Sequence, residues 1–421
     1  MQNISLNISS IGNSGDGVSE YNGKKVYVPF SYTGEIIEAQ VEEELSSHIN
    51  ARISKINTPS SHRSPPPCEY FTKCGGCKLQ HLNEDAYSKF KSEILSDLIK
   101  SLKVEYVDIE PLFVVPQHSR RRVEFKISVH KGNINIGFFA PRSHNVIDIQ
   151  NCLVADNNIN SVIPHLKEAI KKLKKPSVIT SANITSLKDG LDVIINTRSK
   201  LSQDENNIFT ELAKTTQIAR LNILAENSEY QTLYDTEKLY VEFGSIKVLL
   251  PTGAFLQATN DSQNALIDFV ENNLHGHNKI ADLYSGCGTF SFPIAKNANF
   301  IGSYEGSDEM VSTIYNASLQ NNLEQKINAT KRNLFNKPLS PKELNNYDAV
   351  IVNPPRNGAL PQIRNISKSQ IKKLIMISCN PKTFKRDALN LLQNGFKIKS
   401  IRAIDQFLYS PHLEIAACFI R

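Results

Sequence analysis

Hydrophobic and polar positions change their pattern along the chain, and each pattern predicts a different kind of element. In the first 55 or so residues, short β-branched and aromatic runs are separated by turn signals such as Asn22-Gly23, which is typical of hairpins in a small barrel. The proline-dense stretch 58–67 cannot continue a helix or a central strand, so it predicts a linker. Apolar residues then recur at helical spacing from 83 to 102.

The pattern changes twice more before the C-terminus. From about 104 to 247 alternating runs predict mostly strands, with one helix near 162–173. After residue 255 strands alternate with helices, which predicts a doubly wound parallel sheet. We therefore predict an α/β protein in four segments: a β-barrel in 1–57, a cysteine-rich segment with a helix in 58–102, a central β-rich domain in 103–247 and an α/β domain in 248–421.

Composition narrows the class of protein. The 421 residues are 40% hydrophobic and 21% charged, which argues against wholesale disorder. The net charge, 48 − 42 = +6, is modest for a protein that packs nucleic acid. There is no apolar run long enough to span a bilayer and no signal sequence, so we expect a cytoplasmic protein without a membrane partner. Three of the seven cysteines lie between 68 and 77, which favours metal binding or catalysis over disulfides.

A glycine turn marks the first candidate binding site. The strand at 279–284 runs into Ser285-Gly-Cys-Gly288, and Glu305 ends the next strand about 20 residues later. Glycines let a ligand approach the backbone, and the carboxylate can accept both hydroxyls of a ribose. The third glycine of the dinucleotide fingerprint is missing, so S-adenosyl-L-methionine fits better than NAD. The alternative is a tight turn with a capping acid.

Two later strands end in residues that can carry chemistry. Asn353-Pro-Pro follows an apolar strand and predicts a rigid loop at the cofactor cleft, or only a strand terminator. Cys379 follows the strand 373–378, with Asn380 as N-cap and Pro381 as first residue of a helix. The helix N-terminus and nearby basic residues predict a stabilised thiolate, which is suited to a nucleophile. The alternative is an inert, buried cysteine.

The last strand region carries a candidate acid or base. A period of two places His412 and Glu414 on one face, with Leu413 and Ile415 on the other. Two polar residues on one face can also be a solvated surface. Their interest comes from an expected sheet edge shared with Cys379.

Taken together, the chain resembles the RNA uracil-C5 methyltransferases over nearly its whole length. The resemblance rests on five motifs in order: Phe255-Leu-Gln-Ala-Thr-Asn260, Asp282-Leu-Tyr-Ser-Gly-Cys-Gly-Thr-Phe290, Asn353-Pro-Pro-Arg-Asn-Gly358, Ser378-Cys-Asn-Pro-Lys-Thr383 and His412-Leu-Glu414. It implies a class I, Rossmann-like methyltransferase domain. The N-terminal stretch resembles a TRAM module, an oligonucleotide-binding-type barrel, which is similar to the 23S rRNA branch.

The resemblance also implies roles for individual residues. Cys379 would add to C6 of uracil and activate C5, and Glu414 would remove the C5 proton. The implied residues of the S-adenosyl-L-methionine site are Gln257, Tyr284, Glu305, Asn333 and Asn353. Two positions depart from the family pattern: Asn353 replaces the usual aspartate, keeping an acceptor oxygen but losing the charge, and Ser285 replaces a cysteine.

A metal site is implied by the same resemblance. The cysteines matched to the family's iron-sulfur segment are Cys68, Cys74, Cys77 and the remote Cys152. Four thiolates bind either a [4Fe-4S] cluster or zinc, and the resemblance favours the cluster.

Other functions remain open from the sequence. They are a tRNA uridine-C5 methyltransferase, an exocyclic-amine methyltransferase suggested by Asn353-Pro-Pro, and a non-catalytic RNA-binding iron-sulfur protein. We expect RNA as the partner, rRNA rather than tRNA, and a monomer. The run Arg120-Arg-Arg122 predicts phosphate contacts or a solvated face.

Overall fold

The computed structural model describes residues 2–237 and 239–421. The chain forms two compact units, each assembled from separate parts of the sequence. The first unit comprises residues 1–97, 137–149 and 407–412, and the second comprises 98–136, 150–406 and 413–421. Among the described residues, no helix has the length and apolar character needed to cross a membrane.

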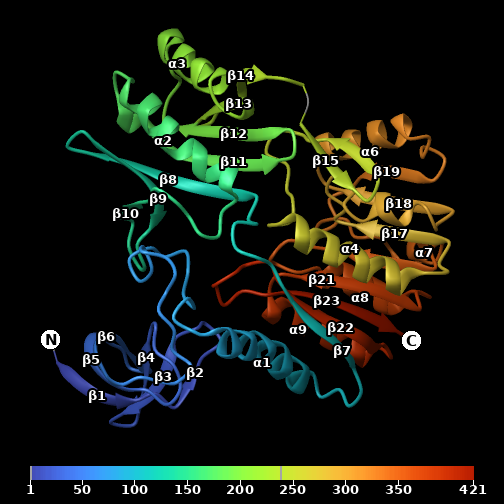
Figure 1. The fold of residues 1–421 in the computed structure, drawn as a ribbon. Coiled ribbons are helices and arrows are strands. Elements are labelled where there is room, and N and C mark those ends of the chain that lie inside the picture. The colour runs from blue at the N-terminus through green and yellow to red at the C-terminus, as the bar shows by residue number, and fades with distance from the viewer. Residues whose placement is uncertain (1, 238) are drawn as a thin grey trace. The chain divides into compact units, whose positions relative to one another are not determined.

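A six-stranded sheet forms the body of the first unit (Figure 1). Its strands are β1 (Asn3–Asn7), β2 (Ser10–Ile11), β3 (Gly17–Tyr21), β4 (Lys24–Val28), β5 (Ile36–Glu44) and β6 (His48–Thr58), in the order β1-β5-β6-β4-β3-β2. Alternate residues such as Val26, Val28 and Ile37 form its core, as the period-two pattern predicts. The pairings of the described residues leave β1 and β2 at the edges, because the two-residue β2 pairs with β3 alone. The sheet is therefore not the closed barrel that the sequence predicts.

Three further segments belong to the first unit: the predicted linker, most of a helix and a hairpin. In the predicted linker, the Arg63 guanidinium donates to both carboxylate oxygens of buried Glu35, at 2.5 and 2.8 Å. The helix predicted at 83–102 is α1 (Glu84–Leu102). A further hairpin joins the end of β9 (Asn133–Phe139) to β10 (Val146–Asp148).

The central part of the second unit is β-rich, as its alternating runs predict. Its strands are β8 (Arg122–His130), the start of β9, β11 (Ile179–Leu187), β12 (Gly190–Thr197), β13 (Ile218–Ala225) and β14 (Gln231–Asp235). Its helices are α2 (Asn157–Lys171), the short η1 (Pro176–Val178) and α3 (Gln203–Lys214), of which the sequence analysis predicts only the first. The β15 (Tyr240–Phe243) and β16 (Ile246–Leu249) hairpin follows.

The predicted α/β domain is an eight-stranded sheet in the order β19-β18-β17-β20-β21-β23-β22-β7. Its strands are β17 (Lys279–Leu283), β18 (Phe300–Glu305), β19 (Ile327–Lys331), β20 (Ala349–Val352), β21 (Lys373–Ser378), β22 (Lys397–Asp405), β23 (Glu414–Ile420) and β7 (Asp108–Val114). Its helices are α4 (Asn260–Leu274), α5 (Ser291–Ile294), α6 (Asp308–Gln320), α7 (Pro341–Leu344), α8 (Leu360–Lys368) and α9 (Pro381–Gln393).

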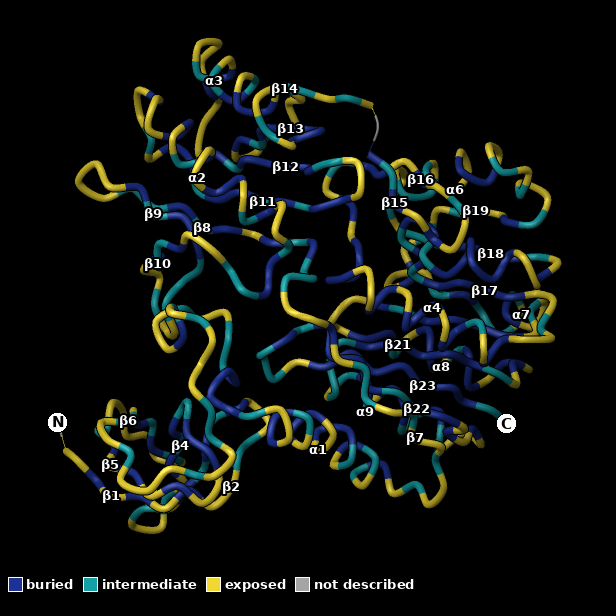
Figure 2. The backbone as a smooth tube through the Cα atoms, viewed as in Figure 1, coloured by how far each residue is buried: buried dark blue, intermediate teal, exposed yellow. Residues whose placement is uncertain are grey.

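The direction of the strands decides where a site can form. β19, β18, β17, β20 and β21 are parallel, whereas β23 is antiparallel to both of its neighbours. The central strands are buried along their length (Figure 2). The strand order reverses beside β17, and ligands of such sheets bind at the carboxyl ends of the strands near this point.

Candidate active site

Five predicted site residues follow the carboxyl ends of adjacent parallel strands. Tyr284 follows β17, Glu305 ends β18, Asn333 follows β19, Asn353 follows β20 and Cys379 follows β21. Parallel strands end at one edge, so the fold brings these positions to the same side of the sheet although they span almost 100 residues of sequence. Motif spacing alone could not show this order.

The glycine turn after β17 is tied to the end of β18. Glu305 accepts from the backbone N–H of Gly286 through Oε2 at 3.0 Å, and from Gly306 through Oε1 at 2.6 Å. Tyr284 has a φ of +61°, a left-handed conformation that is uncommon for a tyrosine. The carboxylate thus fixes the turn as well as lying beside it.

Buried polar atoms at this turn lack partners among the described residues. They are the Tyr284 hydroxyl, the Ser285 hydroxyl and one carboxylate oxygen of Asp282. Burial raises the pKa of Asp282 to about 7, although Ser291 donates to its other oxygen at 2.6 Å. Buried polar groups in proteins are usually hydrogen-bonded, so such groups point to a ligand. A Cβ added at Gly286 would meet nothing within 4 Å, which leaves room beside the backbone.

The loop after β20 is fastened to α9. The backbone oxygen of Arg356 accepts from the Asn380 side chain at 3.2 Å, and the Ala359 N–H donates to Asp387 at 2.8 Å. Gly358 has a φ of +74°, and a Cβ there would lie 2.5 Å from a side-chain nitrogen of α9. The loop that carries Asn353 therefore has a fixed shape.

Asn333 has a local role in this structure. It is exposed, and its side-chain oxygen accepts from the N–H groups of Phe335 and Asn336 at 3.1 and 3.2 Å. This arrangement places the partly exposed Phe335 ring with its centroid 5.4 Å from that of Tyr284. Phe335 could not be predicted from the sequence, because nothing in its local pattern indicates an aromatic neighbour 51 positions earlier in the chain.

The candidate nucleophile and base meet through antiparallel pairing. Ser378 of β21 pairs with Ile415 of β23, so one further step in the same register sets Cys379 opposite Glu414. Burial raises the pKa of the Cys379 thiol, the Glu414 charge raises it further, and the Arg356 guanidinium opposes both. Burial also raises the pKa of Glu414 to about 8, against a hydrogen bond from Gln406.

Two expectations about these strands are wrong. We expected a lowered pKa for the Cys379 thiol from nearby basic residues, but burial and a carboxylate remote in sequence outweigh them. His412 does not share a strand face with Glu414, because β23 begins at Glu414 and His412 lies before it, exposed. The N-cap Asn380 and the helix start at Pro381 are confirmed.

Comparison with known proteins now adds the family. A sequence model described as tRNA (uracil-5-)-methyltransferase matches residues 84–421. The chain belongs to this family. The resemblance drawn from the five motifs is thereby confirmed.

Relatives of the family match the chain over nearly its whole length. An uncharacterized RNA methyltransferase of Brucella suis is 31% identical, covering 98% of this chain and 96% of that protein. A 23S rRNA (uracil(1939)-C(5))-methyltransferase of Shewanella amazonensis is 26% identical, covering 99% and 96%. The crystal structure of the Pyrococcus abyssi tRNA (uracil-54, C5)-methyltransferase with S-adenosyl-L-homocysteine has a TM-score of 0.76 at 24% identity and covers 99% of each chain. This last likeness shows that the fold is that of a methyltransferase of the family.

Two arginines of the run 120–122 bond to other parts of the protein, so they do not form the solvated face that was one of the two predictions. Arg121 is buried, and its guanidinium donates to the backbone oxygen of Gln257 at 3.0 Å and to Gln263 at 2.8 Å. Burial lowers its pKa to about 10. Arg122 donates to the oxygen of Leu256 at 2.9 Å. These arginines thus hold the segment that carries Gln257, a role that charge patterning could not reveal.

The cysteine segment does not form the predicted metal site in this structure. Within the described part of the chain, there is no group of three histidine, cysteine or acidic side chains that could hold a metal ion. Cys68, Cys74 and Cys77 belong to the first unit and Cys152 to the second. The [4Fe-4S] assignment therefore stays a prediction from the resemblance.

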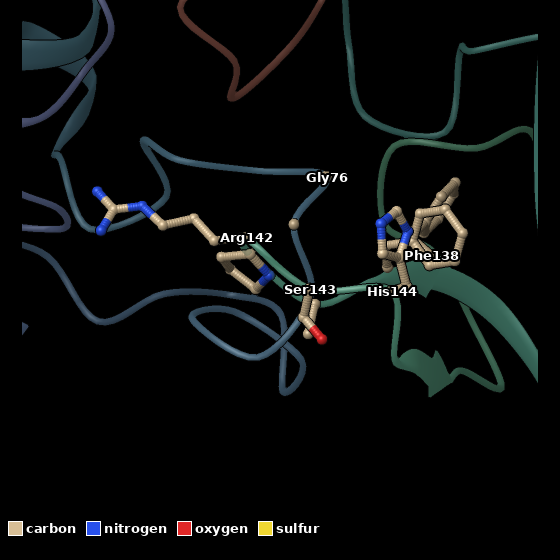
Figure 3. A pocket seen from close by; sticks show the side chains of 9 residues that line it. Gly76, Phe138, Arg142, Ser143 and His144 are labelled. Atoms are coloured by element: carbon tan, nitrogen blue, oxygen red, sulfur yellow. The ribbon is translucent and has the colours of Figure 1, made fainter. Parts of the chain in front are cut away.

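A pocket of 540 Å³ lies beside two glycines of the cysteine segment (Figure 3). It is lined by Gly75, Gly76 and residues 138–144. The Gly75 N–H donates to the Phe139 oxygen at 2.8 Å, and a Cβ on Gly75 would lie 2.7 Å from that oxygen. A glycine is therefore required where the segment meets the β9–β10 hairpin.

Proposed function

We propose that this chain transfers a methyl group from S-adenosyl-L-methionine to C5 of a uridine in RNA. The observation that carries the proposal is the order in which candidate residues lie along one edge of the sheet. Candidate cofactor residues lie at the ends of β17, β18 and β20, a thiol follows β21, and a buried carboxylate lies opposite that thiol on β23. C5 methylation needs these three groups around one uracil ring: a nucleophile for C6, a methyl donor for C5 and a base for the C5 proton.

The cofactor would be held by the turn after β17 and its neighbours. Glu305 would accept from the ribose hydroxyls, and the partnerless hydroxyls of Tyr284 and Ser285 are available to bind it. Gln257 and Asn353 complete the proposed set, with Asn333 acting through the turn that it caps. When bound, S-adenosyl-L-methionine supplies an electrophilic methyl group.

Cys379 would make C5 nucleophilic. C5 of uracil is a poor carbon nucleophile, so addition of the thiolate to C6 is needed to place electron density on C5. The Arg356 guanidinium, hydrogen-bonded to the thiol, favours the thiolate against the raised pKa of the buried group. Deprotonation of Cys379 is therefore part of the barrier in the free enzyme.

Glu414 would complete the reaction. After C5 has gained the methyl group, the Glu414 carboxylate takes the C5 proton, the C–H electrons form the C5–C6 double bond and the Cys379 thiolate leaves C6. A base with a pKa of about 8 is far stronger than an ordinary glutamate, which suits removal of a proton from carbon.

We propose 23S rRNA as the substrate. The proposal rests on the Shewanella relative, because the match covers 99% of this chain and 96% of that protein. The target base must leave its stack to reach a buried thiol, so we expect a uridine in a loop or a flipped uridine. tRNA is the second candidate, because the Pyrococcus enzyme of similar fold acts on tRNA.

The test is methylation of undermodified rRNA and tRNA, with nucleoside mass spectrometry for 5-methyluridine. The wild-type protein should form 5-methyluridine in rRNA, and Cys379→Ala should form none. A 5-fluorouridine transcript should be trapped as a covalent protein–RNA adduct that requires Cys379, because fluorine cannot leave as a proton. Methyl transfer by Cys379→Ala would instead support an exocyclic-amine methyltransferase, and RNA binding without any transfer would support a non-catalytic protein.

A further inference from the structure

A buried glutamine joins the candidate base to the segment that carries Gln257. Gln406 follows β22, is 3% exposed, and donates through Nε2 to Oε2 of Glu414 at 2.6 Å. Its Oε1 accepts from the backbone N–H of Ala258 at 3.1 Å and lies 3.0 Å from the hydroxyl of Ser262 at the start of α4. The amide therefore bridges three separate parts of the second unit.

The orientation of this amide is fixed by its partners. A backbone N–H can only donate, so the side of Gln406 that faces Ala258 must be its oxygen. The NH₂ group then faces Glu414. Thr259 is fully buried and donates to the Ser262 hydroxyl at 2.9 Å, which holds that hydroxyl in place beside the amide oxygen. The network presents a donor to the carboxylate and cannot present an acceptor.

We propose that Gln406 is the positioning residue of the methylation reaction, holding Glu414 in the ionised form and in the orientation needed to remove the C5 proton. The inference rests on the proposed function of Glu414. Gln406 engages only one carboxylate oxygen, which leaves the other to receive the proton. Because the same amide is anchored at Ala258, next to Gln257, the base is built onto the segment that would contact the methyl donor.

The surroundings of Glu414 explain why such a donor matters. From the end of β21 the half-buried Cys379 thiol faces it, and after β22 the amide of Gln406 donates to it, while Asp405 is the neighbouring buried acid at the end of β22. Ser262 of α4 bonds to the other end of the Gln406 amide. Burial raises the pKa of Glu414, and the hydrogen bond from Gln406 lowers it. Without the amide, the carboxyl would hold its proton to higher pH and the last step would slow.

The decisive variant is Gln406→Met, which keeps the side-chain length and removes the amide. We expect kcat at pH 7.5 to fall about 10- to 100-fold, the range for one lost hydrogen bond to a charged group, with KM for RNA unchanged within twofold. The methylated RNA should accumulate as a covalent adduct with Cys379, and the rising limb of the pH–rate profile should move to higher pH. Ser262→Ala, which removes one support of the amide, should shift all three readouts in the same direction by less.

The matched control is Ser400→Ala. Ser400 lies on β22, the strand that precedes Gln406, and its hydroxyl donates to Asn273 of α4 at 3.2 Å. Ser400→Ala thus removes a buried bond to the same helix, and no bond between Ser400 and Glu414 is found among the described residues. It should lower the melting temperature without adduct accumulation or a pH shift. If Gln406→Met does not fold, the same measurements are made on Ser262→Ala and Gln406→Glu. Gln406→Glu places a second carboxyl group against Glu414.

The outcomes separate the inference from the proposed function. The role of Gln406 alone would be overturned if Gln406→Met folds, keeps the wild-type kcat and pH profile, and gives no adduct. Glu414→Gln must accumulate adduct in the same experiment. If neither variant nor the fluorinated transcript gave a Cys379 adduct in an active enzyme, the proposed function would fall first.

Discussion

Replacing the buried base with its neutral isostere should make the protein more stable, and increasingly so as the pH rises. Glu414 has a pKa of about 8 in the folded protein against an ordinary value of 4.5. Between these values the folded state binds more protons than the unfolded state, so the free energy of unfolding falls as the pH increases. Glu414→Gln carries no proton to lose and accepts from Gln406 in the same place.

The size of the effect follows from the shift of the pKa. The difference, 8 − 4.5 = 3.5, corresponds to about 5 kcal/mol at about 1.36 kcal/mol per pH unit. The stability advantage of Glu414→Gln should therefore grow from roughly 1 kcal/mol near pH 5 to roughly 4 kcal/mol near pH 8. A penalty of this size is consistent with a carboxylate kept buried for its chemistry.

The measurement is urea unfolding of both proteins at several pH values between about 5 and 8. Glu324→Gln, which removes an exposed glutamate of the same domain, controls for the loss of one negative charge. If the unfolding midpoints of wild type and Glu414→Gln differ by the same amount at every pH from 5 to 8, a raised pKa of Glu414 in the folded state is refuted. The variant should also have lost turnover, since it has no carboxylate to take the C5 proton.

Further predictions concern rate, backbone and core. The rate of methylation should rise with pH until Glu414 and Cys379 are both ionised, because burial raises the pKa of each; a rate that falls over pH 6 to 8 would contradict this. Gly358→Ala should cost roughly 1–3 kcal/mol and most activity, measured by melting and by 5-methyluridine formation, because a φ of +74° is strained for alanine and its Cβ would displace the Arg386 and Asp387 side chains that hold the loop. Asp192→Asn should cost roughly 3–5 kcal/mol in urea unfolding, since it breaks a buried pair to Arg220 at 2.8 Å, and its folded fraction should keep methylating. The resemblance implies a cluster on Cys68, Cys74, Cys77 and Cys152, so anaerobically purified protein should contain iron, and a zinc-only preparation would refute the cluster.

The sequence predicted the strand ends of the site well, because those signals are local. An apolar run followed by glycine, by Asn353-Pro-Pro or by an N-cap asparagine marks the end of a strand without reference to the rest of the chain. β21 matches its predicted range, 373–378. The motifs therefore place Cys379 and the other strand ends of the candidate site correctly in secondary structure.

What the sequence could not predict depends on contacts between distant segments. The pairing of Gln406 with Glu414, the burial of Arg121 and the raised pKa of Cys379 all arise from neighbours brought together by the sheet. Basic residues adjacent in sequence suggested a thiolate, yet a carboxylate 35 positions later and burial decide the direction. Helix α3 was missed for a related reason, because its amphipathic pattern is short and lies between strong strand signals.

The far edge of the catalytic sheet has a consequence for biosynthesis. β7 pairs in parallel with β22, yet 397 − 114 = 283 positions separate the end of one from the start of the other. At the usual pace of a ribosome, β7 emerges on the order of 15 to 60 seconds before its partner exists. During that interval the exposed Ile109 and the unpaired backbone of β7 can join another nascent chain. Yield in cells should therefore respond to translation speed and to chaperone supply, and a catalytic fragment that begins after β7 should aggregate along β22.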